Sequence, residues 1–213
     1  MNDLTVPEKL AKLRELMTNQ SIDALVVMSA DPHMSEYLPD YWKARQWLSG
    51  FSGSVGTLVV TQNFAGLWAD GRYWVQAEQQ LAGTGFQLQK LTSDESSTHL
   101  AWIEKNLPAG SVISVNGQTL SIQQFKALEN TAKQLGFKLE TQQDLIGLIW
   151  LNRPELPLEQ IHLMPEGLNA LSRKEKIQAI RETLKTKAIE GHFISSLDDI
   201  AWVLNARGQD VEY

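Results

Sequence analysis

The stretch TLVVTQNFAGLWA, residues 57–69, contains two apolar runs separated by a short turn. The runs at residues 57–61 and 65–69 each have the length of one strand, and only residues 62–64 lie between them. Because two strands joined by so short a loop pair antiparallel, we expect a β-hairpin here.

Further strands and helices alternate on both sides of this hairpin. Residues 24–28 (ALVVM) form a continuous apolar run, which is typical of a strand buried on both faces. We predict further strands over 86–91, 112–115 and 137–139, and helices over 7–20, 72–81, 97–107 and 121–136. Capping boxes mark three helix starts, at Thr5/Glu8, Ser121/Gln124 and Ser172/Glu175. The alternation predicts an α/β fold.

A proline-containing segment divides the chain. Pro154 and Pro157 disfavour a helix and favour an extended linker. We therefore predict a first domain over residues 1–145, a linker over 146–160, and the start of a second domain over 161–213.

Residues 9–38 align without a gap with residues 176–205. The apolar stripe of the first helix falls on that of the second. Six positions are identical: Lys9/Lys176, Arg14/Arg181, Glu15/Glu182, Ile22/Ile189, Ser29/Ser196 and Asp31/Asp198. We interpret this as an internal duplication, with a helix over 172–188 and a strand near 192–195. The alternative, that any amphipathic helix followed by a strand aligns this well, stays open. Since the second copy stops early, we expect the chain to be the front part of a longer protein.

The composition excludes several classes of protein. With 43% hydrophobic and 21% charged residues the chain is globular, and a net charge of −6 argues against non-specific nucleic-acid binding. The absence of cysteine excludes disulfides and thiolate metal sites. Residues 1–4 are polar and predict no signal peptide, and no apolar run reaches the roughly 18 residues that a membrane span needs.

The sequence contains no motif typical of a metal site or a catalytic site. The four histidines (His33, His99, His162 and His192) are far apart, and we expect one of Asp198 and Asp199 to cap a helix that runs to Asn205. The glycines of residues 50–56 precede a strand and do not open a helix, which argues against a dinucleotide site.

The tetrapeptide Asp70-Gly71-Arg72-Tyr73 is unusual. Asp70 and Gly71 predict a tight turn, which places Arg72 in the first turn of the next helix. A cation there opposes the helix dipole by about 0.3–1 kcal/mol, so its presence suggests a role other than helix stability. A salt bridge to Asp70 and a solvated arginine both stay open as alternatives.

Four stretches of the chain resemble a known family. Residues 29–37 (SADPHMSEY), 49–57 (SGFSGSVGT) and 67–73 (LWADGRY) resemble the N-terminal domain of the three-domain Xaa-Pro aminopeptidases, of the creatinase/prolidase N-terminal domain family. Residues 196–208 (SLDDIAWVLNARG) resemble the start of their second domain. The family commonly has two arginines where this chain has Ala44-Arg45, and threonine where it has Ala69. Neither difference changes the assignment.

The resemblance implies two creatinase-like α/β domains, each a mixed sheet flanked by helices, with the second one partial here. A catalytic domain would follow, with two divalent metal ions, usually manganese, and it would remove the N-terminal residue from peptides with proline at the second position. None of its metal ligands falls in this chain, so we expect no catalytic residue, no cofactor and no activity here. The absence of cysteine fits a cytoplasmic protein, and a homodimer of the full-length form stays open.

The resemblance further implies that Arg72 reaches toward the bound peptide and that the aromatic segment 33–57 shapes the cleft. The alternative for Tyr37, Trp42, Trp47 and Phe51 is ordinary packing. An alternative function also stays open: a non-catalytic creatinase-like module that binds protein or peptide partners.

Overall fold

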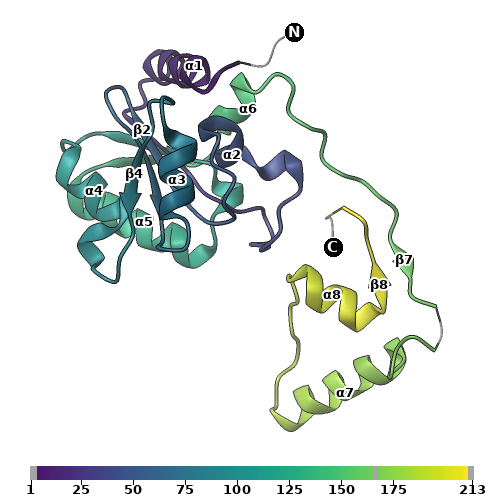
Figure 1. The fold of residues 1–213 in the computed structure, drawn as a ribbon. Coiled ribbons are helices and arrows are strands. Elements are labelled where there is room, and N and C mark those ends of the chain that lie inside the picture. Colours follow the sequence, from purple (N-terminus) through teal and green to yellow (C-terminus); the bar gives the residue numbers. More distant parts are fainter. Residues whose placement is uncertain (1–3, 166, 211–213) are drawn as a thin grey trace.

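The computed structural model describes residues 4–165 and 167–210. A larger first unit (residues 4–153) is followed by an extended segment and a smaller second unit (residues 159–210) (Figure 1). Met1, Asn2 and Asp3, on which the signal-peptide prediction largely rests, lie outside the described residues. In the described part of the chain no helix is long and apolar enough to cross a membrane.

A six-stranded mixed sheet forms the centre of the first unit. Its order is β4-β3-β2-β1-β5-β6, with β1–β2 and β2–β3 antiparallel and the other pairs parallel. The strands are β1 (Ala24–Val27), β2 (Thr57–Thr61), β3 (Ala65–Ala69), β4 (Gln87–Lys90), β5 (Val112–Val115) and β6 (Lys138–Glu140). The predicted hairpin is confirmed as β2–β3, and all four residues of β1 are buried, as the continuous apolar run predicted.

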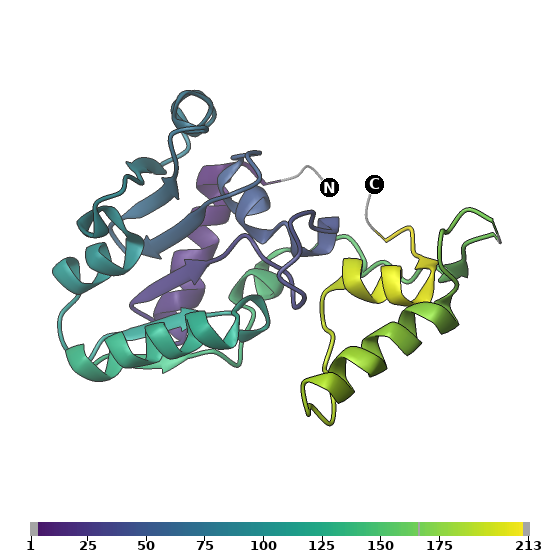
Figure 2. The ribbon, with the colours of Figure 1, turned by 90° about the horizontal axis from the view of Figure 1, so that it is seen from below.

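Helices cover both faces of this sheet (Figure 2). One core cluster includes apolar residues of α1, α2, α3 and α6, and the other includes those of α4 and α5. The helices are α1 (Val6–Asn19), α2 (Ala44–Ser49), α3 (Trp74–Leu81), α4 (His99–Asn106), α5 (Ile122–Leu135) and α6 (Leu145–Ile149), with 3-10 turns η1 (Asp40–Trp42), η2 (Glu95–Ser97) and η3 (Gly117–Thr119). The predicted capping boxes at Thr5 and Ser121 are confirmed at α1 and α5.

Two helices were not predicted. Helix α2 lies within the aromatic segment, and α6 extends into the predicted linker, so residues 146–149 are helical. Leu145 and Ile146 are buried in the same core cluster as α1, because this short helix carries apolar residues that cover the end of that cluster. The packing of the first unit therefore continues past residue 145.

The second unit contains β7 (His162–Leu163), α7 (Arg173–Thr186), α8 (Leu197–Leu204) and β8 (Ala206–Arg207), with β7 and β8 antiparallel. The predicted helix and its Ser172/Glu175 capping box are confirmed as α7. The strand predicted near 192–195 is wrong, because these residues form no strand. In the first unit β1 pairs with both β2 and β5, and the described second unit has no counterpart of either strand.

The gap-free form of the duplication is also wrong, since residues 197–204 form a helix where residues 30–37 form a loop. The counterpart of α8 is α2. Lys9 donates to the Trp47 carbonyl at 2.9 Å and Lys176 to the Trp202 carbonyl at 2.8 Å, each with its ammonium over the indole. The residues that end α2 and α8, Gly50 and Asn205, are both left-handed.

The connection between α1 and α2 in the first unit is longer than the connection between α7 and α8 in the second unit. The offset between the units falls from 167 at the lysines to 155 at the tryptophans, so the first unit has twelve more residues before the second helix. The shared lysine–tryptophan contact supports a duplication with this insertion, which lies in the loop of residues 30–43.

Candidate functional site

Arg72 lies in a turn between β3 and α3. The helix begins at Trp74, so the prediction that Arg72 occupies its first turn is wrong. The Asp70 carboxylate accepts a hydrogen bond from the Arg72 backbone N–H at 3.0 Å, and the Asp70 carbonyl accepts one from the Tyr73 N–H at 3.0 Å. Aspartate stabilises such turns by this side-chain contact, and the helix therefore begins two residues later than predicted.

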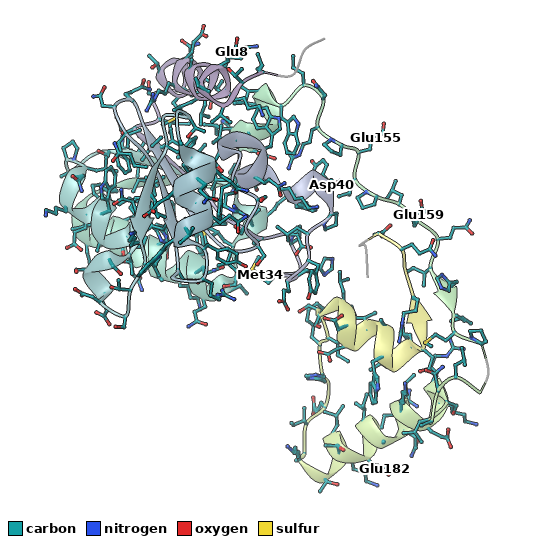
Figure 3. All side chains as sticks on the ribbon, in the orientation of Figure 1. Glu8, Met34, Asp40, Glu155, Glu159 and Glu182 are labelled. Carbon is teal, nitrogen blue, oxygen red and sulfur yellow. The ribbon has the colours of Figure 1, made fainter. Side chains whose placement is uncertain are left out.

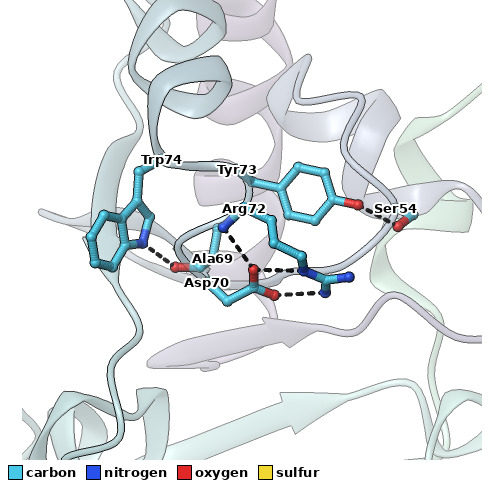
Figure 4. Close-up of polar contacts among 6 residues, drawn as sticks. All are labelled: Ser54, Ala69, Asp70, Arg72, Tyr73 and Trp74. Atoms are coloured by element: carbon cyan, nitrogen blue, oxygen red, sulfur yellow. Dashed lines mark hydrogen bonds and ion pairs between the residues drawn. The ribbon is translucent and has the colours of Figure 1, made fainter.

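The guanidinium of Arg72 forms a two-point ion pair with Asp70 (Figure 4). Its Nε and Nη2 atoms lie 2.9 Å from Oδ1 and Oδ2. The side chain of Arg72 is nevertheless 67% exposed, against 34% for Asp70. Both alternatives from the sequence thus hold: Arg72 forms a salt bridge and is solvated.

The ion pair keeps both groups charged. The hydrogen bond from Arg72 holds the pKa of Asp70 below its usual value, and the same bond raises the pKa of Arg72. The negative charge of Glu36 also raises the pKa of Arg72. Because the two charges offset each other, the exposed guanidinium offers hydrogen-bond donors with little net charge. Such a group can donate hydrogen bonds to an acceptor of another molecule, such as a peptide carbonyl.

Tyr73 attaches this turn to the glycine-rich loop of residues 50–56. Its hydroxyl lies 2.7 Å from Ser54 Oγ, and its ring meets the ring of Phe51 edge to face, with centroids 5.9 Å apart. On the other side, the Trp74 indole N–H donates to the Ala69 carbonyl at 2.9 Å. The backbone that carries Arg72 is therefore fixed from both sides.

Gly53 makes the contact between the loop and Tyr73 possible. A Cβ atom at this position would lie 2.3 Å from Cζ of Phe51 and 2.8 Å from Cδ1 of Tyr73. Only glycine allows such a close approach, which explains part of the glycine-rich run.

Arg45 organises the same loop from the inside, and sequence analysis did not identify it. Its guanidinium donates to Ser29 Oγ at 2.5 Å, to the Phe51 carbonyl at 2.9 Å and to the Gly53 carbonyl. Only 6% of the residue is exposed, and burial lowers its pKa to about 10, so it stays charged near neutral pH. A lone arginine shortly before a glycine-rich loop was the available signal, because the carbonyls of such a loop need donors.

The aromatic residues of segment 33–57 mostly pack. Trp42 and Phe51 are buried, and Trp47 stacks on Trp150 with centroids 5.0 Å apart. Tyr37 differs, since half of it is exposed. Packing therefore accounts for three of the four aromatic residues considered for the cleft, and only the fourth, Tyr37, offers a large exposed ring.

The residues that were considered for metal binding or capping lie apart. Within residues 4–165 and 167–210, no group of three or more histidine, aspartate and glutamate side chains could hold a metal ion. The cap of α8 is Ser196, whose hydroxyl accepts from the Asp199 N–H. Asp198 and Asp199 lie in the first turn instead, where the helix dipole favours negative charge.

Two family models, both described as "Creatinase/Prolidase N-terminal domain", match residues 9–146 and 152–213. The chain is 36% identical over 215 residues to a "Probable Xaa-Pro aminopeptidase P" of Aspergillus flavus and 35% identical to one of Ajellomyces dermatitidis. Both alignments cover 100% of this chain but only 33% and 35% of those proteins. The chain thus spans about a third of the length of these relatives.

Among solved structures, the chain matches the X-prolyl aminopeptidase of Caenorhabditis elegans, described as a cytosolic enzyme with a di-nuclear active site. The TM-score is 0.87 at 34% identity, over 98% of this chain and 35% of the other. An Xaa-Pro aminopeptidase structure from Streptococcus thermophilus matches 68% of this chain with a TM-score of 0.53 at 20% identity, which shows a shared fold alone.

Proposed function

Because the chain belongs to the creatinase/prolidase N-terminal domain family, we propose that it is the non-catalytic N-terminal region of an Xaa-Pro aminopeptidase. The whole protein removes the N-terminal residue from peptides with proline at the second position. The observation that carries this proposal is the match of 98% of the chain, with a TM-score of 0.87, to 35% of the length of a nematode X-prolyl aminopeptidase.

Arg72 is the residue of this chain that contacts the peptide. Three features of the turn support this role: the guanidinium is 67% exposed, Asp70 fixes its orientation at two points, and Tyr73 fixes the backbone beneath it. A donor held in place loses little conformational entropy when it binds an acceptor, and a planar guanidinium can donate two parallel hydrogen bonds. The acceptor is a main-chain carbonyl or the carboxylate of the peptide.

The bond-breaking step belongs to residues outside this chain. The described residues include no group that fits a metal ion, so no metal-dependent step is assigned to them. In the longer protein two divalent ions would polarise the scissile bond and activate water. The family resemblance implies that these ions are manganese. The location of that protein is cytosolic, like that described for the nematode enzyme.

The test is hydrolysis of Arg-Pro-Pro by the 213-residue chain and by a longer protein that contains it. We expect release of arginine by the longer protein with manganese, and neither turnover nor tight manganese binding in calorimetry by the 213-residue chain. Turnover by rigorously purified 213-residue chain would overturn the proposal. A longer protein without turnover or metal binding would instead favour a non-catalytic binding module.

A further inference from the structure

The segment that connects the two units is anchored to the first unit by Arg153. The Arg153 side chain is only 10% exposed, although the residue begins a proline-containing linker. Its Nε donates to the Tyr41 carbonyl at 2.8 Å, and its Nη1 pairs with the Asp144 carboxylate at 2.5 Å. Asp144 also caps α6 through the Gly147 N–H, so the ion pair is attached to the core of the first unit.

Aromatic rings surround the same guanidinium. Its central carbon lies 3.8 Å from the ring centroid of Tyr41, 5.8 Å from that of Trp42 and 5.5 Å from that of Trp150. A guanidinium can stack on rings and donate in its own plane at once, which an ammonium group cannot do. Arg153 therefore links the loop of residues 30–43 to α6 and to the start of the linker.

The other end of the linker is attached to the second unit. The Glu159 N–H donates to the Asp210 carboxylate at 2.9 Å, and the Met164 N–H donates to the Asn205 carbonyl at 2.8 Å. Strand β7 lies between these contacts and pairs with β8. Only residues 154–158 (PELPL) separate the two anchors, and two of these five residues are prolines, whose rings fix φ. Short proline-rich linkers act as semi-rigid spacers.

The loop of residues 30–43 makes a third contact between the units. It is the loop that carries the twelve additional residues of the first unit, and it supplies Tyr41 and Trp42 to Arg153. His33 Nδ1 in the same loop lies 3.1 Å from the Ser195 carbonyl of the second unit. Met34 and Asp40 mark this loop in Figure 3, on the side of the first unit nearest to α8.

From these contacts we infer that Arg153 is a positioning residue that fixes the second unit relative to the first. Relative motion is the usual expectation for two units joined by a small interface. Here the linker is anchored at both ends, contains two prolines and is accompanied by a contact from the loop of residues 30–43. The two units therefore hold one relative orientation, which depends on Arg153. This inference does not depend on the proposed function.

The natural absence of cysteine makes the test direct. Gln123→Cys in α5 and Lys185→Cys in α7 place one spin label on each unit of the 213-residue chain, and double electron–electron resonance measures their distance distribution. We expect a single narrow distribution with Arg153 present. Arg153→Ala, and also Arg153→Lys, should make it about twice as wide or wider, because the linker loses its first anchor. Arg181→Ala, which removes an exposed arginine of α7, is the matched control and should leave the width unchanged.

Circular dichroism and the melting temperature establish that each variant is folded. If Arg153→Ala unfolds the first unit, the double variant Pro154→Gly, Pro157→Gly replaces it as the test, since this variant leaves every side chain of the core in place. The distance distribution between the two labels is again expected to become wider. A broad distribution for the parent chain, or an unchanged width in a folded Arg153→Ala variant, would overturn the inference. In the first case the units move freely, and in the second another contact holds them.

Discussion

Two arginines contact the same group of loops in opposite ways. Arg45 is buried and donates to a hydroxyl and two backbone carbonyls, whereas Arg72 is exposed and pairs with a carboxylate. The contact between Phe51 and Tyr73 connects the surroundings of the two arginines. Arg45 therefore lies on the inner side of the glycine-rich loop and Arg72 on its outer side. The difference suggests that Arg45 holds the loop in shape, while Arg72 uses that shape to present its donors to another molecule.

The largest effect on stability is expected for Arg45→Ala. The substitution leaves the buried carbonyls of Phe51 and Gly53 without their donor, which should lower the free energy of unfolding by about 3–5 kcal/mol. Urea unfolding of the 213-residue chain measures the loss, with Arg72→Ala as the matched control. Equal and small losses for the two variants would remove the distinction between them.

A half-buried histidine adds a second case to the comparison, because its surroundings favour the loss of its charge, whereas Arg45 stays charged. His99 packs against the indole of Trp68, and burial lowers its pKa to about 4. In the unfolded chain a histidine has a pKa of about 6.5, so the unfolded state binds the extra proton first as the pH falls. The resulting stability is complete above pH 6.5 and is lost as the pH falls toward 4, by about 2–3 kcal/mol.

The measurement is the free energy of unfolding between pH 4 and 7 for the parent chain and for His99→Gln. The variant should lose most of the slope, while His192→Gln, which changes an exposed histidine, should keep it. If His99→Gln and the parent chain have the same slope, His99 does not carry the pH dependence.

The sequence was sufficient for the parts of the fold that local patterns determine. The β2–β3 hairpin follows from two apolar runs and a short turn, and the capping boxes of α1, α5 and α7 follow from side chains that satisfy nearby N–H groups. These signals need no information about distant residues.

The parts that depend on distant partners could not be predicted. The segment 192–195 has strand-like residues, but a strand forms only where another strand pairs with it. Arg45 reads as an ordinary polar residue until the folded chain places the Phe51 and Gly53 carbonyls around it. Arg72 was found through its motif, but its pairing with Asp70 shifted it out of the helix where the sequence placed it.

The contact between the two regions should have a smaller effect. Tyr73→Phe removes the hydroxyl that meets Ser54 Oγ and should cost about 1 kcal/mol in the free energy of unfolding. Ser54→Ala should cost a similar amount, and the double variant should cost less than the sum of the two single losses, since one hydrogen bond is lost only once. Additive losses in this cycle would show that the two hydroxyl groups do not depend on each other.

The smallest effect on stability, and the most direct test of the central claim, belongs to Arg72. In a full-length protein that contains this sequence, the melting temperature and kcat/KM for Arg-Pro-Pro are measured for the parent protein, Arg72→Ala and Arg72→Lys. We expect an unchanged melting temperature, because an exposed ion pair contributes little to folding, and a fall in kcat/KM of about tenfold or more for alanine with incomplete recovery for lysine. A large drop in melting temperature with unchanged turnover would contradict the account and show that Arg72, like Arg45, is a structural residue.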